Sequence, residues 1–206
     1  MVFAEASCTE FAARLASRDA VPGGGGASAL VGALGAALAS MVGNLTTGKK
    51  KYAAYEEDIQ FILKRAAELQ EELIGLIDRD AECFEPLSKA YSIPKDDPDR
   101  DTVMENALRV ACSVPMDIIR MCARVIELHV ELAEKGSTLA VSDVGCGAVF
   151  CKAALQGAAL SVFINTKSMK DREYAAQIET EADAILAKST AMADGIYDTV
   201  AKKLRG

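Results

Sequence analysis

The sequence is poor in the residues that build metal sites and in aromatic side chains. Its 206 residues include one histidine, His129, and no tryptophan. The six cysteines form no Cys-x-x-Cys pair, and structural zinc sites usually need clustered ligands of that kind. We therefore predict no metal, and the sequence contains no motif for another cofactor. Cysteines among apolar helical residues are expected to act as small core side chains.

Basic charge and targeting signals are also scarce. The chain has 23 Lys and Arg against 30 Asp and Glu, a formal net charge of −7, so nucleic acid is not an expected partner. The N-terminal residues 1–5 lack the basic stretch and apolar run of a secretory signal. Together with the unclustered cysteines, this predicts a cytoplasmic protein.

No charged residue occurs between Ala20 and Gly48, and three lysines follow directly. A transmembrane helix would have similar length and flanks, but most of 27–45 is Ala, Gly, Ser and Asn. We therefore predict a buried helix and no membrane insertion. We expect its small-residue face to make a close helix-pair or subunit contact and its large-residue face to enter the core. The small face comprises Gly32, Ala36, Ala39 and Gly43, and the large face comprises Leu34, Leu38, Met41 and Leu45.

Elsewhere apolar residues recur at steps of three and four, which is typical of helices, and no segment alternates as a β-strand does. Ser7 and Glu10 have capping-box spacing, so the first helix is expected to begin there. Pro86 is expected to kink or end one helix, Pro115 to bend another, and Ser142-Asp143 to cap a third. Further helices are predicted at 27–45, about 49–90, about 101–135, 142–163 and after Asp171.

The fold class is therefore predicted as all-α. We expect one domain over residues 1–206, a bundle of about five to six helices around a buried, small-residue central helix.

Four consecutive glycines, Gly23 to Gly26, precede the uncharged helix. Glycines let several backbone N–H groups point at one spot, and a helix N-terminus adds partial positive charge there. This arrangement favours a site for an anion or a carbonyl group. A flexible linker is the alternative interpretation. The spacing fits neither a nucleotide P-loop nor a Rossmann turn.

Asp80 is the most informative acidic residue. The apolar stripe that passes through Leu73 and Leu76 continues onto Asp80 and Phe84, whereas Asp78 lies about 200° away around the helix. Burial against a core raises a carboxyl pKa, so Asp80 is a candidate general acid or base. The alternative is a structural carboxylate that caps a neighbouring helix or pairs with a lysine.

Two other features favour structural interpretations. His129 lies on an apolar stripe, where a single histidine is more often a hydrogen-bonded core residue than a catalyst. The lysines at 49–51 are typical of a solvated helix start, although they could also receive a polyanionic ligand tail.

Taken in order along the chain, several segments resemble the cyclodeaminase/cyclohydrolase family of tetrahydrofolate enzymes, in its free-standing bacterial form. The resemblance spans nearly the whole chain. Its motifs are Pro22-Gly-Gly-Gly, Gly32-Ala-Leu-Gly-Ala-Ala-Leu-Ala-Ser-Met-Val42, Leu45-Thr-Thr-Gly-Lys49, Asp78-Arg-Asp-Ala-Glu-Cys-Phe84, Ile93-Pro-Lys95, Ser113-Val-Pro115, Ser142-Asp143 and Asn165-Thr-Lys167.

The resemblance implies an all-helical homodimer or higher homo-oligomer with a folate substrate, which is polyglutamylated in one interpretation. Relatives either hydrolyse 5,10-methenyltetrahydrofolate to 10-formyltetrahydrofolate or cyclise 5-formiminotetrahydrofolate to 5,10-methenyltetrahydrofolate with loss of ammonia. We favour the cyclohydrolase, because the chain lacks the domain that supplies the formimino substrate. The cyclodeaminase is the alternative, and a non-catalytic folate-binding or scaffolding bundle is an alternative of another class.

The resemblance also implies roles for individual residues. The acidic motif falls on Asp78 and Asp80, which are therefore the catalytic candidates. The position of Asp80 on the apolar face of its helix favours Asp80 of the two. The family usually has Ser after three glycines, where this chain has Gly26, and Ser28 is a candidate substitute. The implied substrate-binding residues are Gly23, Gly24, Gly25, Gly26, Ser28, Lys49, Asp143, Asn165 and Lys167.

Overall fold

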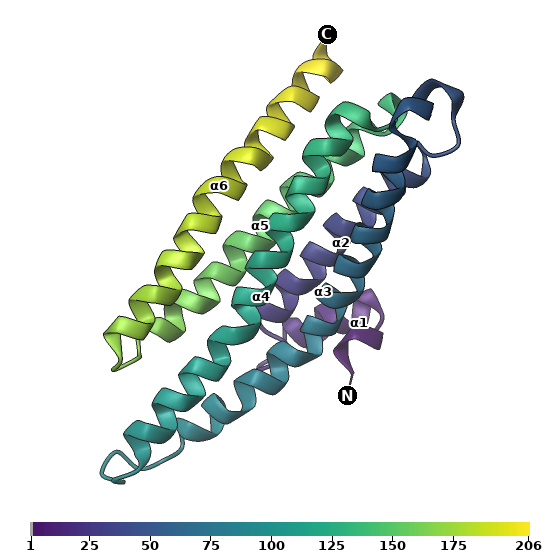
Figure 1. Cartoon of the computed structure of the whole chain (residues 1–206). Coiled ribbons are helices and arrows are strands. Elements are labelled where there is room, and N and C mark those ends of the chain that lie inside the picture. The colour runs from purple at the N-terminus through teal and green to yellow at the C-terminus, as the bar shows by residue number, and fades with distance from the viewer. Residues whose placement is uncertain (1) are drawn as a thin grey trace.

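The computed structural model describes residues 2–206, and this part of the chain is helical, with no β-strand (Figure 1). The prediction of an all-α fold is confirmed. The α-helices are α1 (Cys8–Leu15), α2 (Gly24–Asn44), α3 (Glu56–Ala90), α4 (Arg100–Lys135), α5 (Val141–Thr166) and α6 (Arg172–Arg205). Short 3-10 turns are η1 (Phe3–Glu5), η2 (Lys50–Tyr55) and η3 (Thr138–Ala140).

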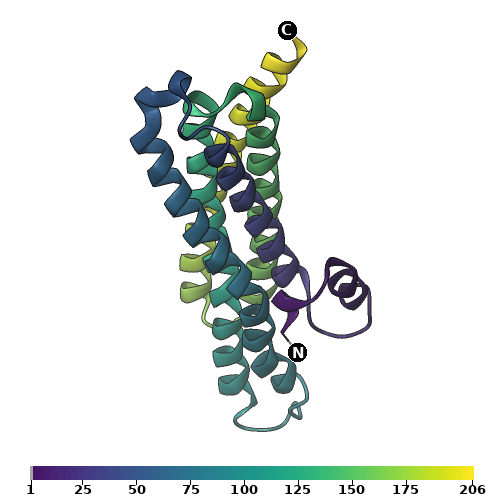
Figure 2. The same cartoon turned by 90° about the vertical axis from the view of Figure 1, so that its right-hand side faces the viewer.

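The five long helices form a bundle in which α2 and α5 lie together against α4. The α3 helix packs on α2 and α4, and α6 packs on α5 and α4. The turn between α3 and α4 lies at one end of the bundle, and η2 and η3 lie at the other (Figure 2). The short α1 helix stands to one side of the bundle, near the beginning of α2 (Figure 2).

Small residues allow α2 and α5 to approach closely. A Cβ atom added at Gly35 would lie 3.0 Å from the carbonyl oxygen of Gly147 and would overlap the Sγ atom of Cys151. A Cβ atom at Gly147 would overlap the imidazole ring of His129. The glycines at these positions therefore set the distance between the two central helices.

The predicted orientation of α2 was wrong for its large-residue face. Gly32, Ala36, Ala39 and Gly43 are buried, as a close helix contact requires. Leu34 and Met41 are instead 49% and 45% exposed. Because α3, α4 and α5 all pack against the small-residue side, close backbone approach takes up the core and leaves the larger side chains outside.

Several predicted boundaries also differ from the structure. The capping box of Ser7 and Glu10 is confirmed, but α2 begins at Gly24, so most of the glycine run is the first turn of the helix. The α5 helix begins at Val141, so Ser142-Asp143 do not cap it. Pro86 lies within α3, which continues to Ala90, and residues 50–55 form η2 before α3 begins.

The segments Gly24–Asn44 and Thr138–Thr166 are long and apolar enough to cross a membrane by length and composition. Within the bundle, 56% and 44% of their most apolar windows are buried. Central helices of a packed bundle have this composition as well, because both of them contact helices on several sides.

His129 is a hydrogen-bonded core residue, as predicted. Its side chain is fully buried, and its Nε2 atom lies 3.0 Å from the carbonyl oxygen of Gly35. The carbonyl can only accept, so Nε2 carries a proton and donates it. Burial lowers the pKa of His129 to about 4, and the Gly35 hydrogen bond opposes this only in part.

This lowered pKa predicts acid-sensitive folding. An unfolded histidine protonates near its usual pKa of about 6.5, whereas the folded one stays neutral, so protons favour the unfolded chain. The free energy of unfolding should fall by about 2 kcal/mol between pH 6.5 and 5 on account of His129. Urea unfolding of the wild type and of His129→Gln over this range measures the effect. Equal pH slopes in the two proteins would contradict it.

Candidate active site

Asp80 on α3 reaches across to the first turn of α2. The backbone N–H of Gly26 donates to Oδ2 of Asp80 at 2.9 Å. The N-cap residue of α2 is Gly23, which has no side chain to accept a hydrogen bond. Helix N-termini leave several N–H groups without partners inside the helix. Asp80 therefore takes the capping role that a side chain in the loop would normally have.

The environment of Asp80 favours its protonated form more than water does. The side chain is half-buried, and burial raises the pKa of this carboxyl above its ordinary value. The Gly26 N–H bond acts in the opposite direction but is the smaller effect. A carboxyl with a raised pKa can hold a proton and release it closer to neutral pH. The second oxygen, Oδ1, has no hydrogen-bond partner in residues 2–206 and so remains free for a ligand.

Asp80 lines a cavity of about 150 Å³ beside the first turn of α2 and the last turns of α5. It is the only side chain in the lining that can carry charge. The lining comes from the segment before α2 and from α2, α3, α4 and α5. It comprises Ala20, Val21, Gly23, Gly24, Gly25, Asp80, Phe84, Ala111, Pro115, Ser161, Ile164 and Asn165.

Gly25 must be a glycine for Asp80 to occupy its position. A Cβ atom added at Gly25 would overlap both carboxyl oxygens of Asp80. At Gly26 an added Cβ would lie 3.9 Å from Oδ2 of Asp80 and no closer than 3.4 Å to any other atom given for that position. The backbone at 26 therefore has room for a Cβ atom, as the serine of the family pattern needs, whereas a side chain at position 25 requires the Asp80 carboxyl to move.

Pro115 orients Asn165 within the cavity. Pro115 lies inside α4 and has no N–H, so the carbonyl of Ala111 lacks its usual partner four residues later. The Nδ2 atom of Asn165 donates to this carbonyl at 3.3 Å. This bond uses the amide nitrogen of the buried Asn165 and leaves its Oδ1 atom available to accept from a ligand.

Not all of the predicted site residues lie at this cavity. The Oγ atom of Ser28 donates to the carbonyl of Gly24 at 2.7 Å, and its position is close to Gly157 of α5. Ser28 therefore does not occupy the place of a residue-26 hydroxyl. Asp78 binds the backbone of residues 3 and 4 and is not in the lining. Lys167 is exposed beyond the end of α5, two residues after Asn165 in sequence but outside the lining.

Asp143 and Lys49 lie at the opposite end of the bundle. Asp143 is in the first turn of α5, whereas Asn165 is in its last turn. At about 1.5 Å per residue the two are roughly 33 Å apart along the helix. Lys49 follows the far end of α2, and its side chain is exposed. One chain therefore cannot bring either residue to the Asp80 cavity.

Some lining residues were missed in the sequence. Ser161 lies one helical turn before Asn165, and Phe84 one turn after Asp80, so both share a face with a predicted residue. That spacing could have identified them. Ala20 and Val21 come from the irregular segment before α2, and periodicity does not apply to such segments.

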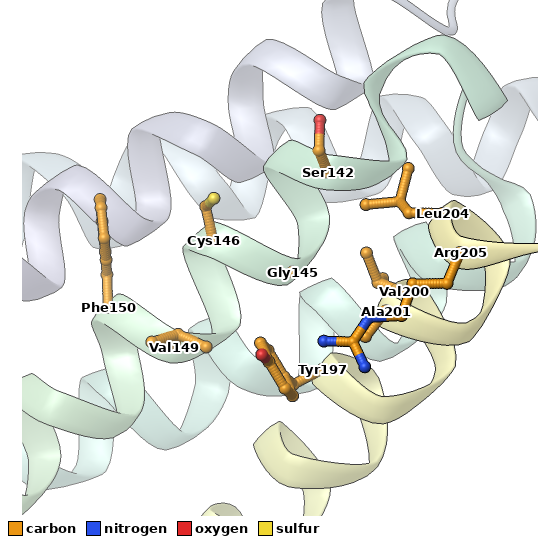
Figure 3. Close-up of a pocket in the computed structure, with 10 residues that line it drawn as sticks. All are labelled: Ser142, Gly145, Cys146, Val149, Phe150, Tyr197, Val200, Ala201, Leu204 and Arg205. Atoms are coloured by element: carbon orange, nitrogen blue, oxygen red, sulfur yellow. The ribbon is translucent and has the colours of Figure 1, made fainter.

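A second cavity of about 380 Å³ lies between the first half of α5 and the end of α6 (Figure 3). Val149, Phe150, Val200 and Leu204 give it an apolar lining, and Arg205 lies across it from α6 (Figure 3). Its lining contains no Asp, Glu or His side chain to act as a general acid or base. Within residues 2–206, no three His, Cys, Asp or Glu side chains are grouped to hold a metal ion. The Asp80 cavity is therefore the better candidate for catalysis.

The contact between Gly25 and Asp80 predicts a selective loss of activity. Gly25→Ala should displace the Asp80 carboxyl by side-chain rotation and reduce turnover on the order of a hundredfold, while the fold is retained. Gly75→Ala on α3 is the matched control, because an added Cβ there meets nothing within 4 Å. Thermal unfolding and turnover should be measured for both. Full activity in Gly25→Ala would contradict this description of the site.

Comparisons with known proteins identify the family of this chain. Methenyltetrahydrofolate cyclohydrolase of Methylorubrum extorquens is 41% identical over 194 residues, covering 92% of this chain and 93% of that protein. Formimidoyltransferase-cyclodeaminase of Sus scrofa is 31% identical over 91% of this chain, which corresponds to 36% of that longer protein. The crystal structure of formiminotetrahydrofolate cyclodeaminase from Thermotoga maritima superposes with a TM-score of 0.83 and 34% identity, covering 98% of this chain and 97% of the other. Residues 7–184 match the formiminotransferase-cyclodeaminase family, and the chain belongs to this family.

Proposed function

We propose that this protein is a folate one-carbon enzyme that hydrolyses 5,10-methenyltetrahydrofolate to 10-formyltetrahydrofolate. The observation that carries the proposal is Asp80, a half-buried carboxyl with a raised pKa beside the free N–H groups of a helix N-terminus. The family and the similarity to the Methylorubrum extorquens cyclohydrolase supply the substrate class.

The reaction needs a group that accepts and then donates one proton. Asp80 in its charged form takes a proton from water as the oxygen attacks the cationic methenyl carbon. This gives a tetrahedral carbon that bridges N5 and N10 of the folate. Protonated Asp80 then returns the proton to N5 as the carbon–N5 bond breaks. The hydroxyl proton is released to water as its oxygen becomes the formyl carbonyl, and N10 keeps the formyl group. The carboxylate also stabilises the cationic substrate before attack.

The cyclodeaminase reaction is the second candidate, supported by the 34% identity to the Thermotoga maritima enzyme. There N10 attacks the carbon of the protonated formimino group. The same carboxylate takes the N10 proton and passes it to the nitrogen that leaves as ammonia. Both reactions pass through a tetrahedral carbon between the same two nitrogens, so one acid–base residue serves either. A non-catalytic folate-binding bundle is a candidate from a different functional class. It is suggested by Gly26, which stands where the family usually has a serine.

We further propose that the active form is a homodimer with antiparallel helices. Support comes from the outer face of α2 and α5, where large apolar side chains are exposed. These include Leu34, Met41 and Leu45 of α2, and Val149, Phe150, Leu160 and Ile164 of α5. Exposed apolar faces of this extent are typical of interfaces. A two-fold axis near the middle of α5 would bring the first turn of one α5 opposite the last turn of the other.

Such a dimer would also complete the folate site. The Asp80 cavity, at about 150 Å³, is smaller than the roughly 300–1,000 Å³ of typical ligand sites. It suits the reacting part of the folate and leaves the remainder outside. The antiparallel arrangement brings Lys49 and Asp143 of one subunit toward the partner's cavity, where the lysine would meet the glutamate tail, single or polyglutamylated. We propose a soluble, cytoplasmic location, as for a small-molecule enzyme without a membrane role.

Asp80→Asn tests the catalytic role. The amide can still accept from Gly26 N–H, so the thermal midpoint should stay near that of the wild type. It cannot accept and return a proton, so turnover should fall on the order of 10²–10⁴-fold. The control is Glu82→Gln, an exposed position on the same helix.

The assay follows methenyl absorbance with methenyltetrahydrofolate and, separately, with 5-formiminotetrahydrofolate. Loss of methenyl absorbance identifies the cyclohydrolase, and its appearance identifies the cyclodeaminase. Undiminished turnover in Asp80→Asn would remove the assigned role. Folate binding by the wild type without turnover of either substrate would favour the non-catalytic bundle.

Mixed dimers test the shared site. A Lys49→Ala/Asp143→Asn chain and an Asp80→Asn chain should each be inactive alone. Co-expressed with different tags, they should recover about a quarter of wild-type activity, because half of the dimers are mixed and each mixed dimer has one intact site. Asp80→Asn mixed with Gly25→Ala is the control and should recover none, because both changes affect the same half of the site. A fully active Lys49→Ala/Asp143→Asn chain would rule out the shared site.

A further inference from the structure

Asp78 binds the N-terminal end of the chain. Its Oδ1 atom accepts from the backbone N–H of Phe3 at 2.5 Å, and its Oδ2 atom accepts from the N–H of Ala4 at 3.1 Å. Each carboxylate oxygen therefore has a backbone donor. Asp78 and Asp80 are two residues apart and lie about 200° apart around α3, which explains why Asp78 is not in the cavity lining.

The N-terminal segment, residues 2–23, has few other attachments to the bundle. Phe11 is the buried side chain of α1, and residues 12–20 are all exposed. Phe3, Ala4 and Ala6 pack against the core and are only partly buried, and Pro22, just before α2, is buried. Apart from helical bonding into α2, the Asp78 bonds are the only hydrogen bonds from residues 2–23 to later parts of the described chain.

The same segment forms one wall of the Asp80 cavity. Ala20 and Val21 are part of the lining, next to Gly23. Asp78 therefore holds the segment to α3 at residues 3 and 4, and Asp80 holds the first turn of α2, which follows the segment, through Gly26. No other charged side chain lines the cavity. The segment therefore affects the pKa of Asp80 mainly through the amount of water that reaches the carboxyl past this wall.

We propose that Asp78 is a positioning residue, which ties the N-terminal segment to α3 and so keeps the wall of the Asp80 cavity closed. This rests on the proposed function for its link to catalysis. Its two oxygens are occupied by backbone donors, so Asp78 does not exchange protons with the substrate. Of the two acidic residues in the motif, one acts on the folate and the other holds the wall beside it.

Asp78→Ala should release residues 2–23 and admit water to the cavity. The hydrogen-bonded backbone amides of this segment, those of Phe3 and Ala4 among them, should exchange with deuterium at least about tenfold faster than in the wild type. The pKa of Asp80, followed by NMR of its carboxyl carbon, should fall toward the ordinary value, because burial is what raises it. Turnover should fall on the order of ten- to a hundredfold in kcat/KM, with the pH–rate profile displaced to lower pH.

Two further variants make the experiment decisive. Glu82→Ala removes the same charge from an exposed position on α3 and should match the wild type in every readout. Asp78→Asn keeps the shape and one strong acceptor, so it should give intermediate effects. It also replaces Asp78→Ala in the measurements if the alanine variant does not fold.

Three results would overturn the proposal. The first is an Asp80 pKa and exchange rates in the Asp78 variants equal to those of Glu82→Ala. The second is lost turnover with unchanged exchange in residues 2–23, which would make Asp78 itself catalytic. The third is faster exchange with an unaltered Asp80 pKa, which would make the segment irrelevant to the site. The exchange and NMR readouts need no substrate, so a wild type that turns over neither folate would overturn the proposed function and leave this test intact.

Discussion

The hydrogen bond from the Gly26 N–H to Asp80 joins the two helices on which the site depends. An α2 helix that begins in glycine has no side chain to cap its own first turn, and Asp80 supplies the acceptor from α3. A half-buried carboxylate is costly without a partner, and the helix N-terminus supplies both a donor and partial positive charge. The two elements therefore stabilise each other, and the free oxygen of Asp80 remains at the cavity.

Other features of the site follow from that contact. Gly25 has no side chain because the Asp80 carboxyl occupies the space where its Cβ atom would be. Pro115 opens the α4 ladder at Ala111, and Asn165 takes the free carbonyl and so fixes its own amide. Asp78 attaches the N-terminal segment to α3, the helix that also carries Asp80. Polar groups with defined directions thus meet around one ionisable side chain in an otherwise uncharged lining.

Much of the fold was predictable because it depends on local patterns. Helical periodicity gave the all-α class, the capping box at Ser7 and Glu10 gave the start of α1, and the stripe through Leu73 and Leu76 put Asp80 on the inner face of α3. The structure brings Asp80, Asn165 and three of the four glycines, Gly23 to Gly25, to one cavity, and their catalytic and binding roles remain predictions.

The parts that sequence could not give depend on tertiary contacts. The inner face of α2 was assigned to its larger side chains, because hydrophobicity says which faces are apolar but not how closely a neighbouring backbone approaches. The distance between Asp143 and Asn165 depends on α5 being one continuous helix. The role of Asp78 depends on amides that lie more than seventy residues away in the sequence.

A crystal structure of the protein with a bound reduced folate would test the central claim most directly. We expect the pteridine to enter the Asp80 cavity beside the glycine turn, with the free oxygen of Asp80 within hydrogen-bond distance of N5 or of the water next to the one-carbon unit. A pteridine bound between α5 and α6, with Asp80 remote from it and still engaged only with Gly26, would contradict the account.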